Sequence, residues 1–230
     1  MSEEHSISPR EEELAAKIRE TYNAGHGKKA LEMSIDFLKE FPESRVARYH
    51  YAVTHGDYSA EIGLSEEESK RYREIGNNGF KALIADPNFK KWPFKFQFSV
   101  RNEYYWFFEL HQEQYELGIE TIPQSENGHY SACVGSSMLA LKSLKAGNIP
   151  LAEEWAEKSL MHFEKYEKYM PDWYNINYFS SQSLACLGRY EEALLCYMDM
   201  YRKQKAPINE AEVAEFTNRL LEFKKYRGEL

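Results

Sequence analysis

The sequence predicts an all-α protein assembled from short helical hairpins, and three observations lead to this fold class. Segments with the alternation of apolar and polar residues that is typical of strands are nearly absent from the 230 residues. Residues that begin helices recur, and glycine or proline separates one apolar run from the next. Gly25, Gly147 and Gly188 each stand five residues before an alanine, a spacing that indicates tightly packed pairs of helices.

Capping residues mark where the helices begin. Ser8 is followed by Pro9 and Glu11, the pattern of an N-cap, a first-turn proline and a capping-box acid. The box recurs as Ser65 with Glu68 and, in a looser form, as Asn209 with Glu212. These starts and the glycine and proline positions predict eleven helices, near residues 9–23, 28–40, 44–56, 65–85, 94–109, 111–121, 129–146, 150–168, 172–187, 190–204 and 209–226.

Two stretches allow a different interpretation. Residues 94–100, FKFQFSV, alternate like a strand, but a single strand would have nothing to pair with, so we predict that they begin a helix. The pair Asn127 and Gly128 is typical of a turn, which should prevent helix formation between Glu126 and His129.

The spacing of small and aromatic residues resembles the tetratricopeptide repeat (TPR) family. In AGHGKKALEMSIDFLKEFP, Ala30, Phe37 and Pro42 occur in the order of that repeat, and LGRYEEALLCYMDM does the same with Ala193 and Tyr197. The resemblance implies a right-handed α-solenoid of about five hairpins over residues 9–208, closed by a capping helix and tail at 209–230. We expect residues 1–8 to be a flexible N-terminus. HEAT-type repeats are an alternative of similar length.

Composition limits the function classes. A net charge of −8 and a pI of about 5.5 disfavour non-specific binding to nucleic acid. No window approaches the 18 uncharged apolar residues of a membrane span, so we expect a cytoplasmic protein with no membrane contact. The three cysteines have no Cys-x-x-Cys spacing, which argues against a disulfide framework or a thiolate zinc site.

The sequence contains no convincing catalytic or metal-binding motif. His50 and His55 are five residues apart and point in different directions on a helix. GNNG at 76–79 lacks the lysine of a nucleotide loop, and CVGSSM at 133–138 fails the pattern of a serine elbow. We therefore expect no cofactor and no metal. An alternative is an all-α enzyme whose groups meet only in three dimensions, near Glu103, Glu109, His111 and Glu113.

The TPR resemblance also implies where a partner would bind. In that family the first helices of successive hairpins line a concave face that holds a protein segment or peptide. The matching positions are Val46, Tyr49, Val53, Val134, Ser137, Leu141, Asn175, Tyr178 and Gln182. We therefore predict a non-enzymatic interaction module or scaffold, with a bacterial peptide receptor of a signalling system as a further alternative. Nothing in the sequence fixes the partner or the oligomeric state.

Overall fold

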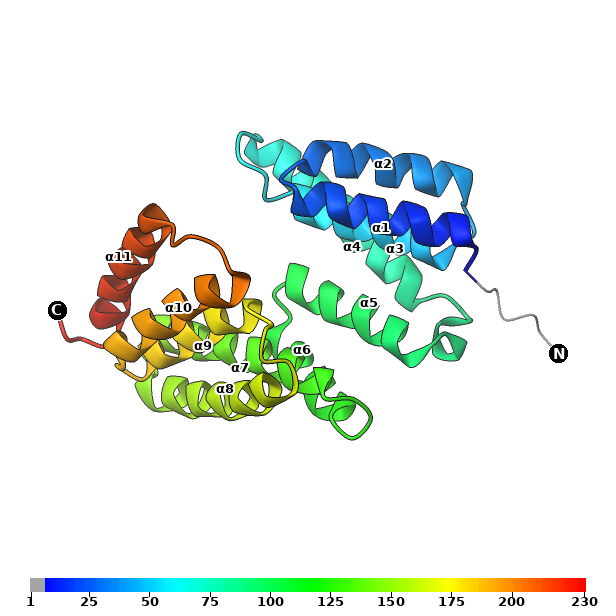
Figure 1. Ribbon diagram of the computed structural model, residues 1–230. Helices are drawn as coiled ribbons and strands as arrows, with labels where there is room; N and C mark the ends of the chain where they lie inside the picture. Colours follow the sequence, from blue (N-terminus) through cyan, green and yellow to red (C-terminus); the bar gives the residue numbers. More distant parts are fainter. Residues whose placement is uncertain (1–6) are drawn as a thin grey trace. The chain divides into compact units, whose positions relative to one another are not determined.

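The computed structural model describes residues 7–230, and these residues form eleven α-helices and no strand (Figure 1). All eleven predicted helices are present within a few residues of the expected positions, including the one that begins with FKFQFSV. Most of the predicted flexible segment 1–8 lies outside the described residues, but Ser8 caps the first helix with the predicted box to Glu11. The chain divides into two compact units. Unit 1 ends at Phe108, and unit 2 begins at Glu109.

Unit 1 contains five helices and one short 3-10 turn. They are α1 (Pro9–Asn23), α2 (Gly27–Glu40), α3 (Arg45–Tyr58), α4 (Glu66–Ile84), η1 (Phe89–Lys91) and α5 (Phe94–Phe107). The turn η1 was not predicted. Each helix packs on the next one in the sequence, and α3 also contacts α1 and α5.

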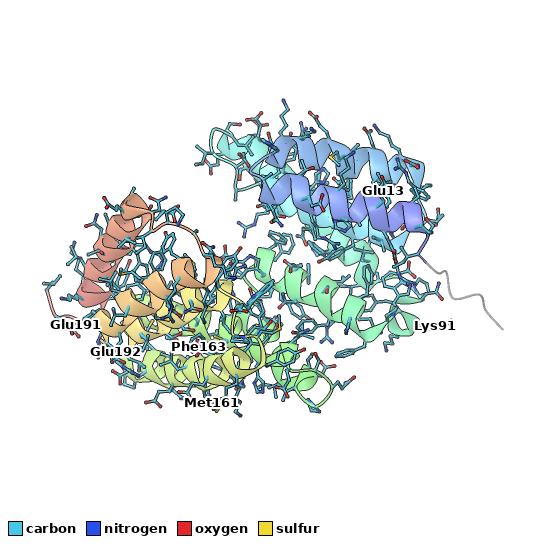
Figure 2. All side chains as sticks on the ribbon, in the orientation of Figure 1. Glu13, Lys91, Met161, Phe163, Glu191 and Glu192 are labelled. Atoms are coloured by element: carbon cyan, nitrogen blue, oxygen red, sulfur yellow. The ribbon has the colours of Figure 1, made fainter. Side chains whose placement is uncertain are left out.

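Unit 2 contains the remaining six helices. They are α6 (His111–Thr121), α7 (Asn127–Lys145), α8 (Ile149–Tyr169), α9 (Asn175–Cys186), α10 (Tyr190–Gln204) and α11 (Glu210–Tyr226). Here α7 contacts α6, α8 and α9, and α11 contacts α7, α9 and α10. The first turn of α10 carries two acidic residues, Glu191 and Glu192 (Figure 2). Their negative charges stabilise the helix because they lie near the positive end of its dipole.

The predicted glycines end their helices in the left-handed conformation. The φ angles of Gly25, Gly147 and Gly188 are +79°, +76° and +76°. In each case the next residue donates its backbone N–H to the carbonyl five residues earlier, as His26 does to Thr21, which is the Schellman arrangement. A side chain with a Cβ would be strained at these positions, so the sequence specifies the turns.

The alanines that follow these glycines lie at close helix contacts. Ala152 and Ala193 are fully buried in one core cluster with Ala140 and Ala185 of the preceding helices. In unit 1 the glycines of GNNG have the same role, because a methyl group on Gly79 would lie 2.9 Å from the Ala52 Cβ atom. The small residues of the predicted hairpins are therefore packing residues.

The contact between α6 and α7 is closer still and depends on Gly118, Gly128 and Gly135. A methyl group on Gly135 would lie 2.6 Å from the backbone nitrogen of Tyr115. One on Gly128 would lie 2.5 Å from the Gly118 carbonyl oxygen. The predicted break at Asn127 and Gly128 is wrong: both residues belong to the first turn of α7, and Gly128 is there because α6 leaves no room for a side chain.

Candidate functional site

In unit 1 the predicted partner-binding residues lie along one side of α3. Val46 is buried, whereas Tyr49 and Val53 are half-buried. The Tyr49 ring packs edge-on against Phe80 and Phe96, with centroids 6.4 and 5.5 Å away. These contacts fix the ring, so Tyr49 presents a rigid aromatic surface at little entropic cost.

Charged side chains from three helices act electrostatically on Tyr49, and they are Arg19 of α1, Asp57 of α3 and Glu103 of α5. We call this surface the α1–α3–α5 face and define it by Arg19, Tyr22, Tyr49, Val53, Asp57 and Glu103. Burial is the main cause that raises the pKa of Tyr22 and of Tyr49. The charge of Asp57 adds to both effects, and the charge of Glu103 adds to the effect on Tyr49. Asp57 could have been found in the sequence, because it lies four residues after Val53 on the same side of the helix.

The two carboxyl groups of this face are poorly solvated. Burial raises the pKa of Asp57 to about 7, and the nearby charge of Glu103 adds to the effect. Burial also raises the pKa of Glu103 to about 7, against an opposing hydrogen bond from Asn102. Both side chains are half-buried rather than enclosed, so each keeps some contact with water. Close to neutral pH the face can therefore gain or lose protons.

Replacement of Asp57 by asparagine should stabilise unit 1 at pH 8 by about 1–2 kcal/mol. Folding raises the pKa of Asp57 from 3.8 to about 7, so the folded protein loses stability as the pH rises through this range and the carboxyl group ionises. Asparagine removes this loss because it resembles the protonated, uncharged form of the side chain. The gain should shrink as the pH approaches 4. Urea denaturation of wild type and Asp57→Asn at pH 4.5 and 8 measures it, with exposed Glu20→Gln as the control. An equal gain at both pH values would contradict the assignment.

In unit 2 several predicted binding residues lie in the interior. Ser137 and Gln182 are 0% and 2% exposed, and Val134 is 2% exposed. Ser137 Oγ donates to the Phe179 carbonyl oxygen at 2.8 Å, and Gln182 Nε2 donates to the Ser137 carbonyl oxygen at 3.2 Å. These bonds join α7 to α9, so neither side chain is available to a partner in this structure.

The other predicted residues of unit 2 are also used by the unit itself, with one exception. Leu141 packs against the core cluster around Ala140. The Tyr178 hydroxyl accepts a hydrogen bond from Arg219 of α11 at 2.8 Å, and that guanidinium lies over the Tyr178 ring. Asn175, at the start of α9, is exposed. The side of α9 that carries Tyr178 is therefore covered by α11.

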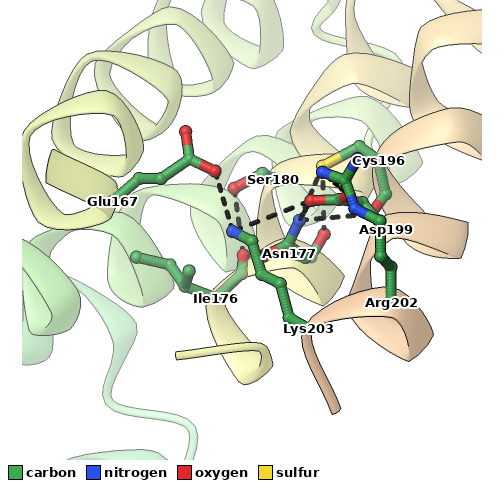
Figure 3. A network of polar contacts seen from close by, with 8 residues as sticks. All are labelled: Glu167, Ile176, Asn177, Ser180, Cys196, Asp199, Arg202 and Lys203. Carbon is green, nitrogen blue, oxygen red and sulfur yellow. Dashed lines mark hydrogen bonds and ion pairs between the residues drawn. The ribbon is translucent and has the colours of Figure 1, made fainter. Parts of the chain in front are cut away.

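A network of polar residues joins α8, α9 and α10 in unit 2 (Figure 3). Lys203 Nζ lies 2.7 Å from Glu167 Oε1, 3.0 Å from Asn177 Oδ1 and 3.8 Å from Asp199 Oδ2. Asn177 Nδ2 donates to the Cys196 carbonyl oxygen at 3.3 Å, and Arg202 pairs with Asp199. Only 10% of the Lys203 side chain is exposed, so the network holds a largely buried cation between two carboxylates.

A hollow of about 550 Å³ lies beside this network. It is lined by Phe163, Glu167, Asn177, Leu195, Cys196, Met198, Asp199, Arg202 and Ile208. The lining residue that α8 contributes beside Glu167 is Phe163, which is labelled in Figure 2. Burial raises the pKa of Cys196 to about 12, which keeps the sulfur as an unreactive thiol. The cations and carboxylates neutralise one another, so the network holds the helices together and offers no free base or nucleophile.

The groups of the enzyme alternative are divided between the units. Glu103 belongs to unit 1, whereas Glu109, His111 and Glu113 belong to unit 2. His111 is buried, and burial lowers its pKa. Across residues 7–230, no three histidine, cysteine or acidic side chains converge as metal ligands. Every helix in that part of the chain is too short or too polar to cross a lipid bilayer.

No family model, curated protein or solved structure matches this chain.

Proposed function

We propose that this chain is an interaction module that binds a segment of another protein on the α1–α3–α5 face of unit 1. The observation that carries the proposal is the composition of that face. A rigid tyrosine and a half-buried valine lie among carboxyl groups that burial has already separated from part of their water. An aromatic and aliphatic centre with a polar border is typical of surfaces that hold proteins.

The charges of the face favour a segment with lysine or arginine beside its apolar anchors. Among the described residues, no cation lowers the pKa of either Asp57 or Glu103. A basic side chain from the partner would stabilise the ionised carboxylates, whereas an acidic segment would be repelled. Arg19 is a positive charge of the same face that acts on Tyr49, so it would oppose a purely basic sequence.

The proposal includes the finer architecture that the TPR resemblance implies, a right-handed solenoid of about five hairpins. Two contacts in unit 1 support it, because α1 touches α3 and α3 touches α5 as the first helices of successive hairpins would. A segment laid across these three helices would meet Tyr22, Tyr49 and Glu103 in turn. Extended or helical peptides both suit such a surface.

The test begins with peptides selected on the purified protein from a random display library. The best binders are then measured by calorimetry against Val53→Lys and Leu195→Lys. Val53 lies in the face, whereas Leu195 is 67% exposed on α10 beside the hollow of unit 2. A positive charge in place of the valine removes an apolar contact and repels a basic segment, so affinity should weaken by at least about tenfold for Val53→Lys only. Loss for Leu195→Lys only would place binding at the hollow and overturn the proposal, and circular dichroism checks that both variants fold.

A further inference from the structure

Two buried histidines form the most unusual polar contact of unit 2. His129 of α7 and His162 of α8 are 33 positions apart, and their Nδ1 atoms lie 2.8 Å from each other. The side chains are 5% and 2% exposed as residues, and their rings are tilted with centroids 5.1 Å apart. The contact therefore fastens α7 to α8 through a single shared proton, since one nitrogen must donate and the other accept.

The surroundings favour one arrangement of the protons. His129 Nε2 lies 3.5 Å from a carboxylate oxygen of Glu126, which favours a proton on this nitrogen, and we assign it there. His129 Nδ1 is then the acceptor, and His162 Nδ1 is the donor. This leaves His162 Nε2 as a bare lone pair, which agrees with its being buried without a hydrogen-bond partner.

We propose that the His129–His162 pair is an acid-sensitive latch between α7 and α8. Each imidazole can take up one more proton. A second proton on His129 would place two N–H groups face to face at 2.8 Å, which destroys the hydrogen bond and leaves a buried positive charge against the neutral His162 ring. A proton on His162 Nε2 would create a buried cation with no acceptor. Either event favours separation of the helices, so that water can reach the rings.

The neighbouring groups do not offset this effect. From α6, the Tyr115 ring packs edge-on against His162 with centroids 6.0 Å apart. From α8, Lys165 is a positive charge that acts against protonation of both histidines. Glu126 favours protonation of His129, but its side chain is 53% exposed and its effect is screened. No group of α9 is among those that shift the pKa of either histidine.

The pH range in which the latch opens is set by the burial of the two histidines and by their closeness to each other. Burial and the second histidine lower the pKa of His162 from 6.5 to about 4, and burial lowers that of His129. A base whose folded pKa is depressed keeps its contribution to stability above the unfolded value and loses it as the pH falls toward the folded one. The latch should hold at pH 7 and above and weaken progressively between pH 6.5 and 4.

Hydrogen exchange measured by mass spectrometry tests the latch in the full chain. Between pH 7.5 and 5.0, after correction for intrinsic rates, protection of α7 and α8 amides should fall about 30-fold relative to α10, the factor given by pKa values of 6.5 and about 4. His129→Gln/His162→Gln should abolish the difference, whereas the control His111→Gln should retain it. No selective loss in wild type, or equal loss in the double variant, would overturn the proposal.

A second measurement needs only the wild-type protein, in case the double variant does not fold. Long-range nitrogen correlation spectra at pH 7.5 should find His162 protonated at Nδ1 and bare at Nε2. Both ring signals should titrate well below pH 6.5. A His162 that is protonated at Nε2, or that titrates with a pKa near 6.5, would contradict the assignment of the pair.

Discussion

Replacement of Gly135 by alanine is expected to destabilise unit 2 by about 3 kcal/mol. In the middle of a helix this change ordinarily stabilises a protein, by up to about 1 kcal/mol, because alanine is the better helix former. Here the added methyl group would meet the Tyr115 nitrogen at 2.6 Å and the His111 carbonyl oxygen at 2.7 Å. Both are backbone atoms of α6, so no rotamer change relieves the clash and the two helices must separate.

Urea denaturation followed by circular dichroism measures this loss. Gly27→Ala is the matched control, because Gly27 is also a buried helical glycine but its nearest neighbour is the Glu61 carboxylate, a flexible side-chain end at 2.7 Å. The control should change stability by no more than about 0.5 kcal/mol. If Gly135→Ala were as stable as wild type, α6 and α7 would not approach as closely as described.

Replacement of Lys203 by methionine should destabilise unit 2 by about 2–3 kcal/mol. Methionine keeps most of the stem but removes the ammonium group. Glu167 and Asp199, whose side chains are 39% and 21% exposed, then lose the cation between them, and Asn177 Oδ1 loses a donor. The loss is smaller than for a fully enclosed ion pair because water can reach Glu167.

The same denaturation experiment, performed at pH 7, tests this prediction. Arg202→Met is the control, since the Arg202 side chain is 81% exposed and its pair with Asp199 is open to solvent. That variant should lose less than about 0.5 kcal/mol. High salt should weaken the effect of Lys203→Met only slightly, because the Lys203 ammonium group is largely buried. Similar losses in the two variants would mean that Lys203 is not the centre of the network.

Local signals made the helices predictable. Ser8 forms the expected capping box with Glu11, and Ser65 forms one with Glu68. A capping box is predictable because it involves only a segment of four consecutive residues. A glycine such as Gly188 ends a helix through its own backbone freedom, which depends on no distant contact.

The candidate site was less predictable, because its properties depend on what covers each helix. Repeat spacing predicts Ser137 and Gln182 as residues of a partner-binding groove, but it cannot show that α7 and α9 bring the two side chains together in the interior, where they bond to each other. Asp57 and Glu103 are ordinary acids in the sequence, and only the packing of three helices separates them from water. The prediction that Gly128 breaks the helix was wrong for the same reason. This residue is glycine because the backbone of α6 lies too close for a side chain, and the sequence alone does not show that contact.

The enclosure of α9 affects how the chain is made. The residues from 176 to 186 of that helix are buried except the half-buried Tyr178. Part of the cover comes from α11 and its C-cap, because Arg219 donates to the Tyr178 hydroxyl and Arg227 donates to the Cys186 carbonyl oxygen. During translation, unit 1 has all its helices before unit 2 begins to emerge. Unit 2 cannot complete the enclosure of α9 until α11 has been synthesised, so the side of α9 that α11 covers stays exposed until then.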